Sequence, residues 1–178
     1  MSDWKLLNTS TASGASSVSF TDLTGYKIFK FVCIDVNPAT DVQKLTFQTS
    51  TDGGSSYGVT VTSTAFRAYH SESGAESALD YDGGNDLAQS SSFNPLTSTI
   101  GNGADESASG QLFLYNPAST TYVKHWMSTF SCYEAGSYEM NQYHAGYFNT
   151  TTAINAIQFK IGSGNLDAVI KQYGLVAT

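Results

Sequence analysis

The sequence predicts one all-β domain, a single-domain antiparallel β-sandwich of jelly-roll-like type with about nine to eleven strands. Three observations support this prediction. Helical periodicity is nearly absent from the 178 residues. Short runs of β-branched and aromatic residues recur instead, separated by clusters of Gly, Ser, Asn and Asp. Charged residues make up only 13% of the chain, whereas the exposed faces of long helices usually carry many Glu, Lys and Arg.

The first part of the chain supplies five expected strands. The segment 26–36 is apolar on both faces in its middle, as expected of a central sandwich strand. Strict alternation follows, with Leu45 and Phe47 on one face and Lys44 on the other. The expected strands, in order, are residues 4–8, 18–20, 26–36, 44–50 and 59–69, with a Ser/Thr/Ala/Gly spacer over 9–17 and a turn over 37–41.

Residues 71–110 differ in composition, being poor in apolar residues and rich in Ser, Gly, Asn and Asp. They predict a long polar loop insertion with a functional or interface role rather than a part of the core, with one short strand or helical turn near 86–90. Regular structure then resumes with Ile157 and Phe159 on one face of a later strand. The remaining expected strands are residues 111–115, 122–134, 138–148, 154–161 and 166–175, of which 122–134 and 138–148 form an aromatic hairpin.

Charge and targeting signals exclude several classes of protein. The formal net charge is −7, the basic residues are scattered, and Arg67 is the only arginine. A nucleic-acid binder or an anionic-membrane binder needs clustered cations, so neither partner is expected. No signal peptide and no transmembrane run is evident, which predicts synthesis in a reducing cytoplasm. Cys33 and Cys132 are therefore expected to be buried free thiols.

The stretch of residues 50–57, Ser-Thr-Asp-Gly-Gly-Ser-Ser-Tyr, carries two enzyme-like patterns. It matches the Asp box of sialidase propellers. Those enzymes need several arginines to bind the substrate carboxylate, and this chain has one. They also carry several Asp boxes on repeated blades, and neither further boxes nor an internal repeat is found here. Residues 54–58 match Gly-x-Ser-x-Gly, but a strand rather than a helix follows. We therefore expect no enzyme activity. The stretch is expected to be a structural turn closing a hairpin, built on Ser50, Asp52, Gly54 and Tyr57.

Other polar residues give weaker indications. Residues 80–86, with Asp80 and Asp82, resemble a calcium loop but lack the bidentate Glu that completes the EF-hand loop. A solvated acidic turn is therefore the main expectation, and no cofactor is predicted. His70, His125 and His144 show no metal-binding spacing. Glu134 and Glu139 flank a surface turn, where a carboxylate stays wet, and are interpreted as rim charges.

The most informative feature is the density of aromatic residues between 115 and 148. Because side chains alternate between the two faces of a strand, these rings cannot all enter one core. Those left outside would lie in a subunit interface, where Tyr and Trp are enriched, or would form a sugar-binding platform, and the sequence does not distinguish the two. The candidates are Tyr115, Tyr122, Trp126, Tyr133, Tyr138, Tyr143 and Tyr147.

Several motifs together resemble a known group of proteins. They are Trp-Lys-Leu-Leu at 4–7, Gly-Tyr-Lys at 25–27, Asn-Pro-Ala-Thr-Asp at 37–41, the stretch 50–57, and Gly-Asn-Leu-Asp at 164–167 followed by Ile-Lys-Gln-Tyr-Gly at 170–174. In this order they resemble small β-sandwich virion structural proteins of tailed bacteriophages, of the capsid decoration or tail-fibre type. The likeness spans the first third and the C-terminal end, and its motifs are structural, so it transfers no catalytic residue.

The resemblance implies a non-enzymatic protein on the outside of a virion, made in the host cytoplasm. A strand close to Met1 and the lack of a coiled-coil stalk favour a capsid decoration (cement) protein that docks directly on the shell. Its partners would be further copies of itself, as a homotrimer, and the major capsid protein or other virion proteins. The alternative is a tail-associated receptor-binding module that recognises host surface carbohydrate through exposed aromatic rings.

Overall fold

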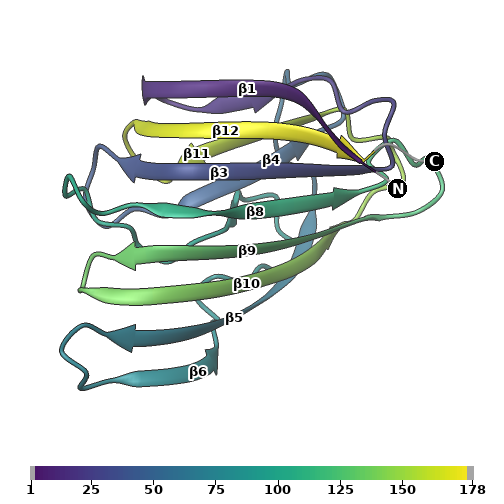
Figure 1. Cartoon of the computed structure of the whole chain (residues 1–178). Helices are drawn as coiled ribbons and strands as arrows, with labels where there is room; N and C mark the ends of the chain where they lie inside the picture. The colour runs from purple at the N-terminus through teal and green to yellow at the C-terminus, as the bar shows by residue number, and fades with distance from the viewer. Residues whose placement is uncertain (1–2, 176–178) are drawn as a thin grey trace.

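The computed structural model describes residues 3–175 and confirms the expected all-β sandwich (Figure 1). Twelve strands form two antiparallel sheets, and no helix occurs among these residues, so none of membrane-spanning length and hydropathy does. The larger sheet has eight strands in the order β1 (Trp4–Ala15), β12 (Leu166–Leu175), β3 (Ile28–Pro38), β8 (Ala108–Tyr115), β9 (Lys124–Glu134), β10 (Tyr138–Phe148), β5 (Val61–Ser71) and β6 (Ser77–Tyr81). The smaller sheet has the order β2 (Val18–Phe20), β11 (Ala156–Ile161), β4 (Leu45–Ser50) and β7 (Asn94–Pro95).

The connectivity is that of a jelly roll with additions. If β1, β12 and the hairpin β9–β10 are set aside, the remaining orders are β2-β11-β4-β7 and β3-β8-β5-β6. The chain crosses between these sheets at most connections, as in the two interleaved Greek keys of a jelly roll. The hairpin β9–β10 is inserted between β8 and β5, and β1 and β12 extend the opposite side (Figure 1). The larger sheet is therefore twice as wide as the smaller one.

Two expectations about the chain are corrected. Residues 9–15, expected to be a spacer, continue β1 and pair with β12 as far as Leu166, because the backbone of β12 offers a full antiparallel partner. Residues 71–110 supply β6 and β7, which raises the strand count to twelve, whereas residues 86–90 contain neither a helix nor a named strand. Leu96 and Ile100 in this segment are fully buried and bond the backbone of Leu45 and Gln43, so part of this polar stretch belongs to the core.

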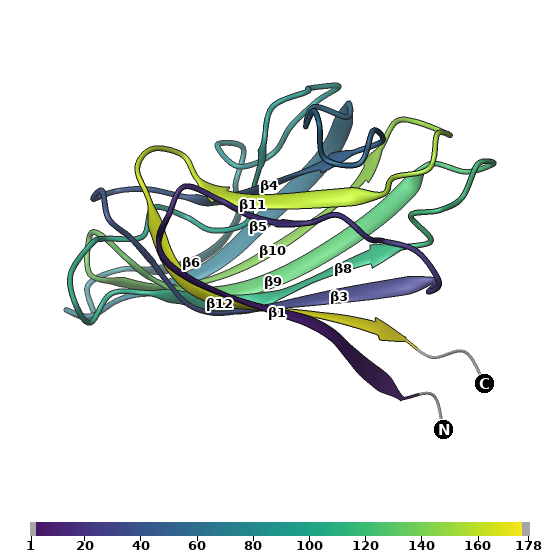
Figure 2. The same ribbon diagram turned by 90° about the horizontal axis from the view of Figure 1, so that it is seen from above.

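The core lies between the sheets, as the view from above shows for β4 and β11 lying over the larger sheet (Figure 2). Phe47 of β4 is at its centre. Its ring contacts Trp126 edge-on at 4.8 Å, Phe148 at 5.9 Å and Phe159 at 6.3 Å between centroids. All four side chains are fully buried. Edge-to-face aromatic contacts add to the free energy of burial, so this cluster joins β4 and β11 to the inserted hairpin.

We expect Phe47→Ala to lower the free energy of unfolding by about 3–5 kcal/mol, because it removes a buried ring and leaves a cavity against three others. Urea denaturation followed by tryptophan fluorescence measures this loss. Tyr122→Ala is the matched control, since Tyr122 is 71% exposed and its loss should change stability by no more than about 0.5 kcal/mol. Equal losses for the two variants would contradict the central place of Phe47.

Candidate functional site

Strand alternation divides the candidate aromatic residues between the two faces of the larger sheet. On β9 and β10, Trp126 and Phe148 point into the core. Trp126 is only 1% exposed, so its place among the surface candidates is corrected: it is a core residue. Tyr115, Tyr133, Tyr143 and Tyr147 occupy outward positions, on the face of the larger sheet that points away from the smaller sheet. We call this surface the outer face.

The two remaining candidates lie elsewhere. Tyr122 is in the loop before β9 and is exposed. Tyr138 lies at an inward position of β10, where its ring packs edge-on against Tyr69 at 5.8 Å. Its hydroxyl donates to Glu76 at 3.0 Å, and this hydrogen bond raises the pKa of Tyr138. The structure therefore brings four of the seven candidates together on one surface.

The outer face exposes large apolar side chains and carries little charge. Six large apolar residues are exposed there by more than a third: Leu6 (49%), Phe66 (47%), Leu79 (72%), Tyr81 (59%), Met127 (54%) and Tyr143 (36%). Among the outward residues of β5, β8, β9 and β10, Glu139 is the only Asp, Glu, Lys or Arg. Soluble monomers rarely expose contiguous apolar surface of this kind, which marks an interaction site.

Strand register places the rings in two ridges. Phe66 of β5 and Tyr143 of β10 are directly paired and stack at 4.9 Å with an interplanar angle of 8°. Phe113 and Tyr115 of β8 stack at 6.4 Å and 15°. Between the ridges, Ala145 and Thr64 carry small side chains, and a hollow of about 250 Å³ opens there. Met127 borders the hollow and accepts a long hydrogen bond from the Tyr115 hydroxyl at 3.9 Å.

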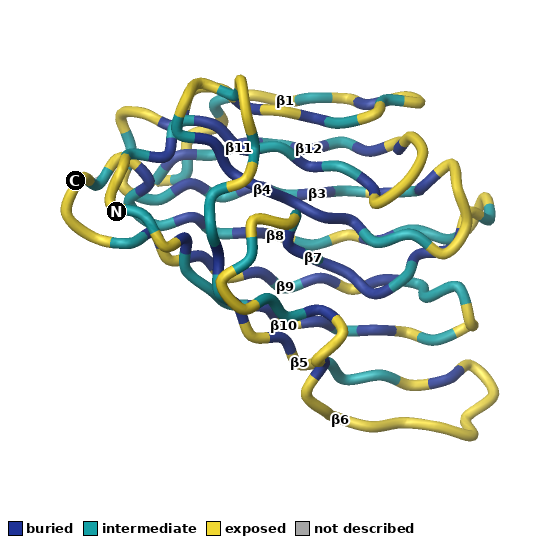
Figure 3. The backbone as a smooth tube through the Cα atoms, turned by 180° about the vertical axis from the view of Figure 1, so that it is seen from behind, coloured by how far each residue is buried: buried dark blue, intermediate teal, exposed yellow. Residues whose placement is uncertain are grey.

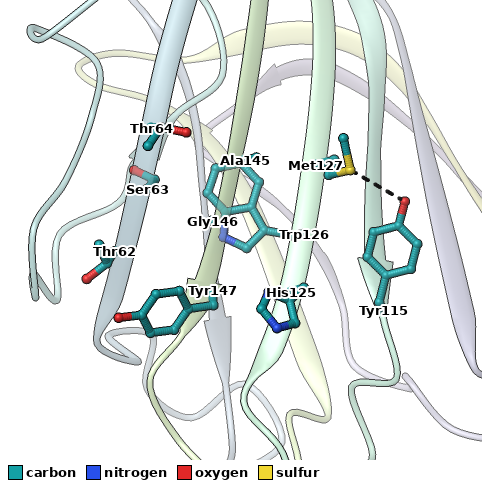
Figure 4. Close-up of a pocket in the computed structure, with 10 residues that line it drawn as sticks. All are labelled: Thr62, Ser63, Thr64, Tyr115, His125, Trp126, Met127, Ala145, Gly146 and Tyr147. Carbon is teal, nitrogen blue, oxygen red and sulfur yellow. Dashed lines mark hydrogen bonds between the residues drawn. The ribbon is translucent and has the colours of Figure 1, made fainter.

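A second hollow of about 480 Å³ adjoins the first along β10 (Figure 4). Gly146 lines it from an inward position, where a Cβ would lie 2.6 Å from the carbonyl oxygen of Thr62 and 2.9 Å from the ring of Trp126. Glycine is therefore required, because its lack of a side chain makes room for the buried indole of Trp126. The rings of His125 and Tyr147, 6.2 Å apart, border this hollow from neighbouring strands. No sequence signal distinguished Gly146, because its importance depends on the pairing of three strands.

Behind the outer face, the inward side chain of His144 is buried without hydrogen bonds to offset the loss of its hydration. It is 3% exposed, and neither ring nitrogen has a hydrogen-bond partner among residues 3–175. Burial lowers its pKa to about 4, an effect that Asp82 opposes and Lys44 reinforces. Ser128, paired with His144 across β9, likewise has a buried hydroxyl without a partner in the described part of the chain. His144 is thus a core residue whose burial favours the neutral imidazole.

We expect stability to fall as the pH is lowered from about 6.5 to about 4, because over this range the unfolded chain binds a proton at His144 and the native chain does not. The loss is about 3 kcal/mol in total, at about 1.4 kcal/mol per pH unit. Urea unfolding at a series of pH values measures it. His144→Phe should flatten this part of the profile, whereas Ser128→Ala should retain it; a steep profile in His144→Phe would refute the assignment.

The stretch 50–57 is a structural turn, but it does not close a hairpin. β4 lies in the smaller sheet and β5 in the larger one, so the turn carries the chain across the sandwich. The Ser50 hydroxyl donates to Asp52 at 2.6 Å and accepts from the Gly54 amide at 3.0 Å. Ser56 donates to Asp52 through both its amide and its hydroxyl. These hydrogen bonds, from Ser50 first and then Ser56, hold the pKa of Asp52 well below its usual range.

Gly54→Ala should lower the free energy of unfolding by about 1–3 kcal/mol, because a left-handed backbone strains any other residue. Its φ is +90°, and a Cβ there would lie 2.8 Å from the hydroxyl oxygen of Tyr57. Gly58→Ala is the control, since its Cβ would meet nothing closer than 3.8 Å. Thermal unfolding of both variants tests the expectation, which fails if Gly58→Ala is the more damaging change.

The acidic stretch 80–86 does not gather its carboxylates. Asp80 pairs with Arg67 at 3.2 Å, and Asp86 accepts from the Tyr81 hydroxyl at 2.5 Å. Asp82 is buried and accepts from Asn85 at 2.7 Å. Each carboxylate therefore has a protein partner, with Arg67 also 3.8 Å from Asp82, and no group of three or more His, Cys, Asp or Glu side chains in residues 3–175 could hold a metal ion.

The two thiols and the two rim glutamates are also in structural settings. Cys33 and Cys132 are buried and free, and burial raises the pKa of each to about 12, which keeps the thiols protonated. Glu134 accepts from the Thr99 hydroxyl and from the Gly136 amide. Glu139 accepts from the Ser131 hydroxyl at 2.8 Å on the outer face. The outer face, which carries these two hollows and a further one of about 520 Å³ lined by β3, β8, β9 and β10, is thus the candidate site.

The chain matches no family model, and no curated protein sequence matches it significantly. The resemblance to virion proteins of tailed phages therefore stays a prediction.

Proposed function

We propose that this chain is a non-enzymatic structural protein of a bacteriophage virion surface, a capsid decoration protein that stabilises the shell through protein interfaces. One observation carries the proposal: the outer face of the eight-stranded sheet is broad, aromatic and almost free of charge. Fully desolvated interface centres are enriched in aromatic residues and Met and depleted of charge. Packing such a surface against another protein is favourable, because it removes apolar area from water.

In this role the protein binds the partners that the resemblance to virion proteins implies. These are further copies of the same chain and the major capsid protein or other virion proteins. The role requires a rigid body that presents a constant surface. Eight paired strands, the Phe47 cluster and the hydrogen-bonded turn at Asp52 support such rigidity. The protein would be made in the host cytoplasm and would reach the virion by assembly.

A second candidate function follows from the hollow above Gly146. Tyr115, His125 and Tyr147 border it with ring surfaces and polar atoms, and Thr62 adds a hydroxyl (Figure 4). Sugar rings bind in settings of this kind, with C–H groups against an aromatic ring and hydroxyls bonded at the rim. The alternative is therefore a tail-associated receptor-binding module for host surface carbohydrate.

Copy number in purified virions separates the two functions. We expect hundreds of copies per particle by quantitative mass spectrometry, because a shell offers many equivalent sites. A handful of copies, together with tight binding of the isolated protein on a glycan array, would support the receptor-binding module instead and contradict decoration.

Phe66→Asp should lower occupancy on the virion by about tenfold or more, since it buries a charge in the proposed interface. Val42→Asp is the matched control, because Val42 is 51% exposed but lies in the loop between β3 and β4. Occupancy is measured after virions that lack the protein are mixed with each purified variant. Full occupancy by a folded Phe66→Asp protein would show that the outer face is not the interface.

A further inference from the structure

We propose that the outer face packs against the same face of a second copy of this chain, about a two-fold axis that runs parallel to the strands over β9. The proposal rests on the role of the outer face as a protein interface, given above, and names the partner that covers it. Three independent features of the face lead to this partner: its area, the placement of its charges, and the match between its ridges and its small residues.

The area is sufficient for a stable pair. Seven strands from β12 to β6, spaced about 4.8 Å apart and each contributing about eight residues at about 3.3 Å, give a face of roughly 900 Å². A standard specific interface buries about 800 Å² on each partner. Two sandwich sheets also pack readily face to face, at about 10 Å, with their strands nearly aligned. Side chains of the two faces then interdigitate as they do inside one sandwich.

The charges select the direction of the axis. The cations of the outer face, Lys30 and Lys171, lie on β3 and β12 at one side of the sheet, where the outward carboxylate of Asp167 already accepts from the Gly14 amide at 2.6 Å. At the other side, beyond β5, the Tyr81 hydroxyl donates to the carboxylate of Asp86. An axis perpendicular to the strands would place the lysines of two copies opposite each other. An axis parallel to the strands exchanges the two sides, so that Lys171 faces the partner's Tyr81 and Asp86.

The register then matches large side chains with small ones. One row runs continuously through seven directly paired residues: Lys171, Val32, Gln111, Thr129, Tyr143, Phe66 and Tyr81. Thr129 is at its middle, so a two-fold axis over β9 places Thr129 opposite itself and Val32 opposite the partner's Phe66. The Gln111 amide comes opposite the hydroxyl-bearing ring of the partner's Tyr143.

The neighbouring row gives the same result. It runs from Lys30 through Phe113, Met127 and Ala145 to Thr64, with Met127 at its middle. The axis places Met127 opposite itself and Phe113 opposite the partner's Ala145. The hollow of about 250 Å³ above Ala145 thus receives the ring of the partner's Phe113. The exposed Met127 is adaptable enough to pack against its own copy.

The solution mass of the purified full chain is the first test. We expect about twice the 19.0 kDa of one chain by light scattering after size exclusion. Met127→Glu should weaken the pair by about 100-fold or more, because two carboxylates would meet on the axis without a counter-charge. Tyr122→Glu, a change of a more exposed side chain away from the face, should leave the pair intact. A wild-type mass of one or three chains would overturn the proposal.

Crosslinking with a short bismaleimide tests the axis itself. Residues on a two-fold axis meet their own copies, so Thr129→Cys should crosslink with itself in high yield. Asn141→Cys should not, but it should crosslink when mixed with Ser109→Cys, because β10 of one copy lies over β8 of the other. Cys33 and Cys132 are buried and stay unlabelled. Self-crosslinking of Asn141→Cys without Thr129→Cys would refute this axis even if the mass were that of a pair.

These results are independent of the virion. A pair in solution combined with a low copy number on virions would retain this interface and remove the decoration role. A monomer that occupies virions in hundreds of copies would retain the decoration role and remove this interface.

Discussion

The two-residue alternation of the hairpin β9–β10 is the constraint on which the rest of the structure depends. This hairpin is inserted between β8 and β5 of a jelly roll and is rich in aromatic residues on both sides. Its inward residues Trp126, Phe130 and Phe148 must fill the sandwich, and Trp126 and Phe148 pack against Phe47. Its outward residues Met127 and Tyr143 must then face away from the core. The alternation that builds the core therefore also builds the apolar outer face.

Several acidic side chains of the protein hold its turns and loops in place. Asp52 organises a crossing turn, Asp82 is held by Asn85, and Asp80 is paired with Arg67. Such local pairing fixes loops at little cost because each charge keeps a hydrogen-bonded partner. The outer face, in contrast, exposes apolar side chains such as Phe66 and Met127. A protein built in this way is suited to packing against other surfaces, whether those of a shell, a second copy or a sugar.

Much of this fold followed from the sequence, and the failures have physical causes. Strict alternation at Leu45 and Phe47 and the aromatic hairpin were sufficient to predict strands and a sandwich. The strands β6 and β7 were missed because β6 is exposed on both faces and carries no alternation (Figure 3), and β7 is only two residues long. Leu96 and Ile100 are isolated apolar residues in a polar stretch, so their burial depends on contacts distant in sequence.

The candidate site could be predicted only in part. The sequence showed that some rings had to leave the core, but the division depends on strand register, which placed Trp126 inside and Tyr143 outside. Phe66, Leu79 and Tyr81 were not among the candidates, because they lie in other strands and join the face only through pairing with β10 and β5.

Hydroxyl-radical footprinting with mass spectrometry tests the central claim, that the outer face is removed from water in the assembled protein. Met127 and Tyr143 are both exposed in a single chain and both react readily with radicals. At assembly concentrations we expect their oxidation to fall severalfold relative to dilute protein, while that of Tyr122 stays constant. Unchanged oxidation of Met127 and Tyr143 across the dilution series and on virions would contradict the account.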